Sequence, residues 1–250
     1  MDHAGIAFDH VRKEYPDGTV AVGDLSLTVT PGEVLCLVGP SGCGKSTTLR
    51  MVNRLVEPSG GIITVDGADV MSQDPVKLRR SIGYVIQHVG LFPHRTVAQN
   101  VATVPGLLKW DKDRTRARVE ELLDLVGLPH ATYGNRYPHE LSGGERQRVG
   151  VARALAVEPP VMLMDEPFGA VDPQGRRRLQ QEFLELQRQL GLTVMMVTHD
   201  MREAVILGDR LAVLSKGGEL EQLGTPDEVT EAPANDFVAD FLADFGTVAG

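Results

Sequence analysis

A glycine-rich segment near the N-terminus has the residue types and spacing of a phosphate-binding loop. Residues 39–47 match the pattern GxxxxGK followed by Ser or Thr, between an apolar run and a stretch of helical character. Glycines let backbone N–H groups surround a phosphate, and the positive end of the next helix faces the anion. Lys45 can reach the terminal phosphates, and the Ser46 hydroxyl suits magnesium. We predict nucleoside triphosphate binding by Gly39, Pro40, Ser41, Gly42, Cys43, Gly44, Lys45, Ser46 and Thr47.

Two acidic residues follow the apolar run Val161–Met164. Acids at the carboxyl end of a strand beside a phosphate loop lie where an open α/β sheet binds its ligand. Asp165 is suited to the magnesium shell, and Glu166 to polarising the water that attacks the γ-phosphate. His199 follows another apolar run, Thr193–Val197. A histidine there is more often a structural or surface group, but this sheet edge also permits a γ-phosphate contact.

A second glycine turn, Leu-Ser-Gly-Gly-Glu at residues 141–145, opens another helical stretch and offers a second anion site. One chain rarely needs two such sites for one phosphate chain. With this segment upstream of the acidic strand, the sequence closely resembles the ATP-binding cassette (ABC) family, whose signature reads LSGGE here. The resemblance covers essentially the whole chain.

The resemblance implies specific roles for matching residues. Tyr15 resembles the aromatic residue that stacks on adenine, and Gln87 resembles the glutamine that senses magnesium and the permease. Asp172 lies in a segment similar to the loop that crosses between subunits, and His199 resembles the switch histidine. The implied catalytic residues are Lys45, Glu166 and His199, and the implied metal-binding residues are Ser46, Gln87 and Asp165. The further nucleotide-binding residues are Tyr15, Gln87, Ser142, Gly143, Gly144, Glu145 and Asp172.

In the family, two cassettes associate head to tail around ATP and Mg²⁺. Lys45 of one copy and Ser142 and Gly144 of the other would hold each nucleotide. One phosphate loop and one signature per chain therefore imply a homodimer. ATP would add charge-assisted hydrogen bonds across the dimer interface, and hydrolysis would remove them.

The elements that must position these residues read as an α/β fold with a largely parallel sheet. The resemblance implies a RecA-like core of the P-loop NTPase type, an antiparallel β subdomain and an inserted helical subdomain. We expect one cassette over residues 1–250, with the helical subdomain at 87–158 and a helical tail at 225–250. A helix is expected over Gln174–Leu190, before Gly191. The expected strands are Ile6–Val11, Leu25–Val29, Val34–Val38, Ile62–Val65, Gly83–Ile86, Val161–Met164, Thr193–Val197, Leu211–Leu214 and Glu219–Leu223, the first two and last two as hairpin or edge strands.

Composition narrows the function classes. The chain has 250 residues, 42% of them hydrophobic, which is enough apolar material for a substantial core. Its formal net charge of -9 argues against nucleic acid as a partner. The longest apolar run, Val34–Val38, is far shorter than the roughly 20 residues that span a bilayer, and we expect a cytosolic chain. Cys36 and Cys43 are expected as reduced thiols.

Within the family, the sequence favours the ATP-hydrolysing subunit of a membrane importer. Soluble cassette ATPases that act on DNA, ribosomes or protein complexes usually carry two cassettes, coiled-coil insertions or basic arms, and none is visible. An importer implies integral permease subunits, a substrate-binding protein and a place on the cytoplasmic face of the membrane. We expect the permease contact around Gln87–Asn100, where Val89, Leu91, Phe92 and Pro93 are apolar.

Three segments resemble the osmoprotectant branch of importers, which carries glycine betaine, carnitine, choline or related quaternary amines. They are residues 84–94, 162–170 and 233–238. His88 stands where that branch would carry a second glutamine, and we expect no regulatory CBS domains in this chain. Importers of methionine or other amino acids are the alternative.

Overall fold

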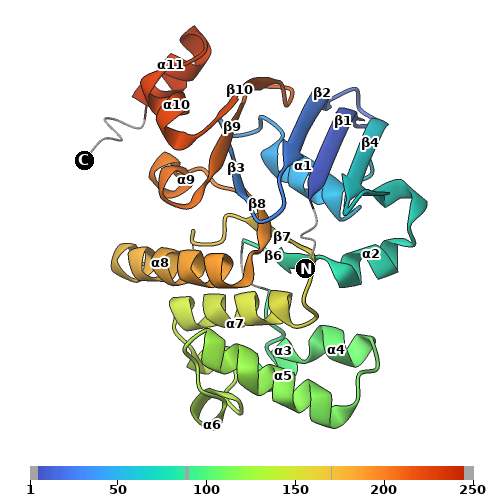
Figure 1. Cartoon of the computed structure of the whole chain (residues 1–250), viewed down its shortest axis with the longest axis vertical. Helices are drawn as coiled ribbons and strands as arrows, with labels where there is room; N and C mark the ends of the chain where they lie inside the picture. Colours follow the sequence, from blue (N-terminus) through green and yellow to red (C-terminus); the bar gives the residue numbers. More distant parts are fainter. Residues whose placement is uncertain (1–4, 88–89, 170, 245–250) are drawn as a thin grey trace.

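The computed structural model describes residues 5–87, 90–169 and 171–244. Its larger sheet has the strand order β10-β9-β3-β8-β7-β6 (Figure 1). Neighbouring strands from β9 to β6 are parallel, and β10 pairs antiparallel with β9. The bounds are β3 (Val34–Val38), β6 (Gly83–Val85), β7 (Val161–Asp165), β8 (Thr193–Val197), β9 (Arg210–Leu214) and β10 (Leu220–Gly224).

Helices cover both faces of this sheet, which explains why its central strands are unbroken apolar runs. Leu35 and Leu37 of β3 belong to a core that includes residues of α1 (Lys45–Val52) and α2 (Pro75–Ser81). Cys36 belongs to a second core, which includes residues of α7 (Gly143–Leu155), α8 (Pro173–Leu190) and α9 (Met201–Leu207). This alternation follows from the two-residue period of a strand.

A smaller antiparallel sheet with the order β2-β1-β4-β5 packs on the α1 side. Its bounds are β1 (Ile6–Glu14), β2 (Val20–Val29), β4 (Gly60–Val65) and β5 (Ala68–Asp69). The predicted hairpins β1–β2 and β9–β10 are confirmed, but β1 and β9 are interior strands rather than edges. The sequence did not predict β5, because two residues carry no periodicity. One turn of 3-10 helix, η1 (Val70–Ser72), and α2 (Pro75–Ser81) follow.

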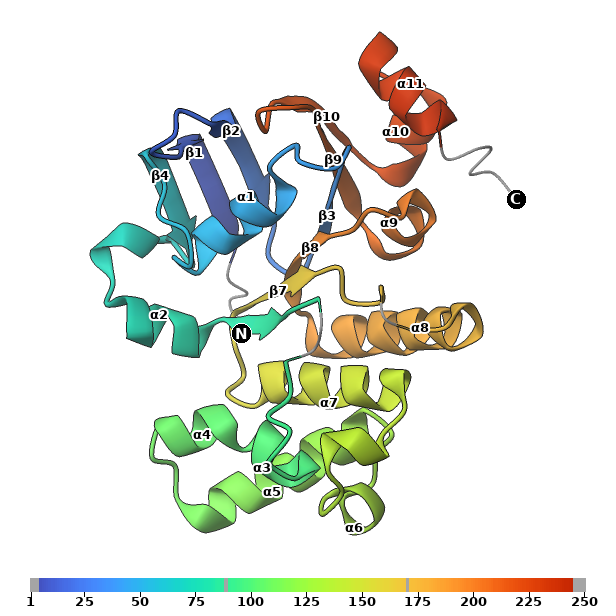
Figure 2. The same ribbon diagram turned by 180° about the vertical axis from the view of Figure 1, so that it is seen from behind.

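Helices occupy the described part of residues 86–160, where the structure places no strand (Figure 2). The longest helix of this region before α7 is α5 (Lys112–Leu125), which is capped by the Asp111 side chain and buries Val119, Leu122 and Leu123. The remaining elements are α3 (Val97–Val101), α4 (Thr103–Leu107), α6 (His130–Tyr133) and the 3-10 helix η2 (Pro138–Glu140). These helices lie at the opposite end of the molecule from the small sheet (Figures 1 and 2).

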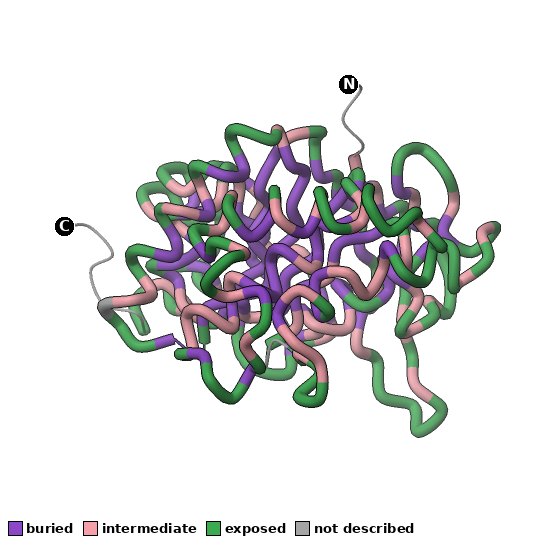
Figure 3. Tube along the Cα trace, turned by 90° about the horizontal axis from the view of Figure 1, so that it is seen from below, coloured by how far each residue is buried: buried purple, intermediate pink, exposed green. Residues whose placement is uncertain are grey.

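Buried residues concentrate along the strands in the middle of the molecule (Figure 3). The predicted long helix is confirmed as α8, which begins one residue earlier than expected and ends at Leu190, followed by the cap residue Gly191 with φ 61°. Two short helices, α10 (Pro226–Glu231) and α11 (Asp236–Ala243), follow β10. Cys36 and Cys43 are free, in line with the expected reduced thiols, and both are buried. Among the described residues, none of the helices has the length and hydropathy needed to cross a bilayer.

Candidate nucleotide-binding and catalytic site

The loop between β3 and α1 follows a backbone path that requires glycine at two positions. Gly39 has φ 146° and Gly44 has φ 104°. An added Cβ would lie 2.2 Å from the Leu214 carbonyl oxygen at Gly39, and 2.3 Å from that of Ala21 at Gly44. Close packing against β9 and β2 therefore fixes the loop, and its N–H groups precede the positive end of α1.

Lys45 opens α1 and points back across this loop. Its Nζ donates hydrogen bonds to the carbonyl oxygens of Gly39 at 2.7 Å and Pro40 at 2.9 Å. The residue is 8% exposed, so its charge is held close to the loop rather than in open solvent. A phosphate bound by the loop would share this ammonium with the two carbonyls.

Ser46 and Asp165 come together beneath the loop, although 119 positions separate them in the sequence. The Ser46 hydroxyl donates to Asp165 Oδ1 at 3.0 Å, and Asp165 Oδ2 accepts a hydrogen bond from Arg50 Nη2 at 3.1 Å. Asp165 is buried, so Ser46 and Arg50 satisfy both carboxylate oxygens. Arg50 is not among the predicted site residues, although its place one helical turn after Ser46 was the available signal.

The pair of Ser46 and Asp165 fits a magnesium ion. Mg²⁺ is commonly held by one or two protein oxygen ligands together with substrate phosphates, and the pair offers one hydroxyl and one carboxylate. In the described part of the chain, groups of three or more His, Cys, Asp or Glu side chains that could hold a metal are absent. The set therefore suits an ion that arrives with a phosphate ligand.

Glu166 lies at the centre of a three-residue cluster. Its Oε2 accepts a hydrogen bond from Gln87 Nε2 at 2.6 Å and lies 3.1 Å from His199 Nδ1. The backbone of Glu166 is left-handed, with φ 47°, and its N–H donates to the Val197 carbonyl oxygen at 2.9 Å. Gln87, Glu166 and His199 thus meet at the carboxyl ends of adjacent strands, and Gln87 contacts Glu166 rather than the Ser46–Asp165 pair.

Tyr15 follows β1 and lies beside the end of the phosphate loop. Its hydroxyl is 3.4 Å from Thr47 Oγ1, and Lys13 Nζ lies 5.0 Å from the ring centroid. The half-buried ring is therefore anchored through its hydroxyl while one face lies under a cation. Tyr15 thus lies beside the predicted nucleotide-binding loop, and its stacking on adenine stays a prediction.

The signature segment forms the capped N-terminus of α7. Ser142 Oγ accepts from the Glu145 N–H at 3.2 Å, and Glu145 Oε2 accepts from the Ser142 N–H at 2.7 Å. The backbone hydrogen bond from Ser142 lowers the pKa of the Glu145 carboxyl. α7 lies below the larger sheet and α1 lies above it (Figures 1 and 2). The signature segment, residues 142–145, therefore lies in a different part of the molecule from the phosphate loop.

Asp172 caps α8, with its Oδ1 accepting a hydrogen bond from the Gly175 N–H at 2.9 Å. One turn later, Arg176 donates to the Val171 carbonyl oxygen at 3.2 Å and lies 3.5 Å from Asp200 Oδ2. Arg176 therefore joins the segment around Asp172 to the residue after His199. This link is not predictable from the sequence, because no local pattern places α8 against Asp200.

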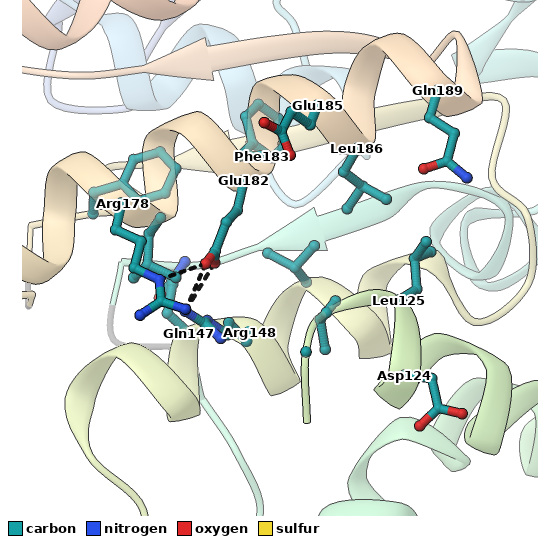
Figure 4. Close-up of a pocket in the computed structure, with 15 residues that line it drawn as sticks. Asp124, Leu125, Gln147, Arg148, Arg178, Glu182, Phe183, Glu185, Leu186 and Gln189 are labelled. Carbon is teal, nitrogen blue, oxygen red and sulfur yellow. Dashed lines mark hydrogen bonds and ion pairs between the residues drawn. The ribbon is translucent and has the colours of Figure 1, made fainter. Parts of the chain in front are cut away.

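A cavity of about 320 Å³ lies between α5, α7 and α8 and is lined by residues other than those predicted for the site. Glu182 of α8 bridges it, with Arg148 Nη2 at 2.8 Å from Oε2 and Arg178 Nε at 2.9 Å from Oε1 (Figure 4). Phe183 and Leu186 form part of the apolar wall. The signature helix thus contacts α8 partly through a charged bridge over a space that side chains do not fill.

Comparison with known proteins agrees with this geometry. Residues 22–169 match a family model described as ABC transporter, and the chain belongs to that family. It is 32% identical to cbiO1 of Clostridium perfringens, with a TM-score of 0.84 over 94% of this chain and 93% of that one. Dimeric MJ0796, an ABC transporter cassette, gives 35% identity and a TM-score of 0.77 over 88% and 98%. The predicted fold class is confirmed.

The particular relatives belong to the osmoprotectant branch, as the sequence analysis predicts. The chain is 55% identical to the glycine betaine/carnitine/choline transport ATP-binding protein OpuCA of Bacillus subtilis, over 95% of this chain and 62% of that protein. It is 52% identical to the glycine betaine uptake system ATP-binding protein YehX of Escherichia coli, over 95% and 76%. The chain thus spans only about three-fifths of the length of the Bacillus relative.

Proposed function

We propose that the chain is the ATP-hydrolysing subunit of an ABC importer. The observation that carries the proposal is the convergence of Gln87 and His199 on Glu166, on the same sheet as the phosphate loop. A carboxylate held by two neighbours beside a phosphate loop suits the activation of water for phosphoryl transfer. The identity to import ATP-binding proteins supports the same assignment.

The residues of the chain divide the reaction between them. Lys45 binds the terminal phosphates, and Ser46 and Asp165 would hold Mg²⁺, which would supply positive charge against the phosphate oxygens. Glu166 takes a proton from the attacking water, which forms the bond to the γ-phosphorus as the bond to the ADP oxygen breaks. His199 keeps one ring nitrogen on Glu166 and offers the other to the γ-phosphate.

A second copy of the chain completes the site in this proposal. The signature residues at the start of α7 lie apart from the phosphate loop, so one chain presents two halves of different sites. Ser142, Gly143, Gly144 and Glu145 of one copy would face the nucleotide bound to Lys45 of its partner, and Asp172 would lie at the crossing. The dimeric MJ0796 cassette supports the arrangement. Residues 1–250 would then act as one cassette, with 87–158 as its helical subdomain and 225–250 as its tail.

The imported solute in this proposal is a quaternary amine such as glycine betaine, carnitine or choline. Support comes from the relatives, which are transport or uptake proteins named for these solutes. The cassettes would bind integral permease subunits at the cytoplasmic face of the membrane and work with a substrate-binding protein.

The permease contact is proposed at the loop before α3. Phe92 is 39% exposed, and its backbone is held by Asn100, whose Oδ1 accepts from the Phe92 N–H at 2.8 Å. The Arg95 guanidinium lies 4.8 Å from the Phe92 ring centroid. An ordered loop thus presents an aromatic ring outward, as a docking site requires. His88 and Val89 lie outside the described residues.

Reconstituted transport tests the proposal. The cassette, its permease and its binding protein would be placed in proteoliposomes with ATP on the cassette side, and uptake of labelled glycine betaine, carnitine, choline and methionine would be compared. We expect ATP-dependent uptake of quaternary amines only. Methionine uptake without quaternary amine uptake would overturn the solute assignment, and ATP turnover without any coupling to these proteins would overturn the importer assignment.

A further inference from the structure

A buried polar cluster next to the candidate site has no role in the mechanism above. It joins Glu203 of α9, Thr198 at the end of β8 and Gln180 of α8, which are 4%, 1% and 4% exposed. The Thr198 hydroxyl donates to Glu203 Oε2, and Gln180 Nε2 donates to Glu203 Oε1 at 3.1 Å. The carboxylate therefore accepts one hydrogen bond from each of two other elements.

The cluster holds the two residues on either side of His199. Thr198 precedes His199, and the Thr198 Oγ1 that donates to Glu203 also accepts a hydrogen bond from the Asp200 N–H at 3.0 Å. Asp200 in turn caps α9 by accepting from the Glu203 N–H at 3.3 Å. Both neighbours of His199 are thus tied to Glu203.

The same cluster reaches the segment that begins at Asp172. Gln180 lies one turn after Arg176 on α8, and Arg176 contacts both the Val171 carbonyl oxygen and the Asp200 carboxylate. Two links therefore join α8 to the His199 loop, one buried through Gln180 and Glu203 and one at the surface through Arg176 and Asp200. A shift of α8 would pull on the loop through both links.

Packing alone does not account for an acid at position 203. Burial raises the pKa of the Glu203 carboxyl, despite the hydrogen bonds from Thr198 and Gln180 that oppose the shift. A buried ionisable group is costly, and a well-packed apolar side chain at such a place is commonly neutral or stabilising. An acid at position 203 is explained by the hydrogen bonds that its two oxygens accept from Thr198 and Gln180.

We propose that Glu203 is a positioning residue, which locks the loop carrying His199 against α8 and so couples the placement of His199 to the segment around Asp172. The inference rests on the proposed ATPase function. Glu203 acts through Thr198 and Gln180 and does not itself touch the reacting atoms.

A double-mutant cycle on the full chain tests this role, with steady-state ATP hydrolysis as the readout. Glu203→Ala is expected to lower kcat about tenfold or more, because small displacements of a catalytic group are expensive, with little change in KM. In a His199→Ala background, Glu203→Ala should cause no further loss, because the group that Glu203 positions is already gone. Thr198→Val removes the hydroxyl at similar volume and provides the same test should Glu203→Ala not fold.

The matched control is Glu33→Gln, which alters another buried acid, paired with Arg210 and placed before the start of β3, at the opposite end of that strand from the phosphate loop. It should leave kcat and KM at wild-type values. Equal losses from Glu203→Ala in the wild-type and His199→Ala backgrounds would overturn the positioning role while leaving the ATPase assignment intact. Wild-type turnover by His199→Ala itself would overturn both the role of His199 and the inference built on it.

Discussion

Glu166 Oε2 and Gln87 Nε2 are 2.6 Å apart, which connects the acid at the end of β7 to the segment that leads from β6 into the helices. The bond ties the candidate base to the loop that we assign to the permease contact. Movement of that loop would therefore change the hydrogen bonding of Glu166. This relationship makes Glu166 the first residue to test.

Glu166→Gln should retain ATP binding and lose turnover by about a hundredfold or more, because the amide cannot take the proton from water. The unhydrolysed nucleotide should hold two chains together, which size-exclusion chromatography with ATP would detect as a dimer. Glu158→Gln is a suitable control, since Glu158 is another glutamate whose backbone is in the left-handed region, and it lies outside the site. Wild-type turnover by Glu166→Gln would refute the assigned role.

Asp165→Asn should weaken the binding of ATP in the presence of Mg²⁺ more than in the presence of a chelator. The substitution removes a charged oxygen that suits Mg²⁺, and it also breaks the ion pair with Arg50. Calorimetric titration with and without EDTA would measure the difference. An equal loss under both conditions would show that Asp165 does not hold the ion.

The bridge from Arg148 to Glu182 should support the docking of the signature helix (Figure 4). In the Glu166→Gln background, Arg148→Ala or Glu182→Ala should weaken the ATP-bound dimer about two- to fivefold, the effect of a partly exposed ion pair. Arg178→Ala is the matched control, because it removes a surface partner of the same carboxylate without touching α7. Analytical ultracentrifugation gives the dimer affinity, and an equal effect of Arg178→Ala would contradict the prediction.

Phe92→Ala should reduce uptake in proteoliposomes severalfold while leaving nucleotide binding by the isolated chain unchanged. The ring is exposed and lies apart from the phosphate loop in sequence, so its loss removes apolar contact area with the permease only. Val76→Ala is the control, since Val76 is another exposed apolar residue. Unchanged uptake by Phe92→Ala would place the permease contact elsewhere.

Glu203 should give the fold a measurable pH dependence. Its folded-state pKa is raised by burial, so its contribution to stability is complete below the unfolded pKa and is lost as pH rises through the folded pKa. As the pH rises above 4.5, the ordinary pKa of a glutamate carboxyl, the unfolding free energy of the wild type should fall relative to that of Glu203→Gln. Asp200 and Arg176, which face Glu203, are present in both proteins. Urea unfolding across this range would measure the difference, and the opposite slope would contradict it.

The sequence predicts well those features whose signal is local. Residue types within a short window predict the phosphate loop, the apolar strand before Asp165 and the long helix α8. The predicted positions agree with the structure. Strand ends are less well predicted: β1 extends to Glu14, past the expected Val11, because its exposed outer residues carry no apolar signal.

Contacts between distant segments could not be predicted from the sequence. Arg50 reaches Asp165 only because β8 lies between β3 and β7 in the sheet, an order that no local pattern encodes. In the sequence, Gln180 and Glu203 look like ordinary polar residues of helices. In the structure, the packing of α8 on α9 buries both side chains. The predictable part of the site is therefore its chemistry, and the unpredictable part is the support around it.

The left-handed backbone of Glu166 means that this position works against the folding of the chain. A non-glycine residue in such a conformation costs on the order of 1 kcal/mol or more, which the hydrogen bond to Val197 and the buried strands on either side must outweigh. Selection for thermal tolerance alone would favour glycine here, and would yield a hardier protein with no base. The glutamate is thus a place where heat resistance and turnover are in direct conflict.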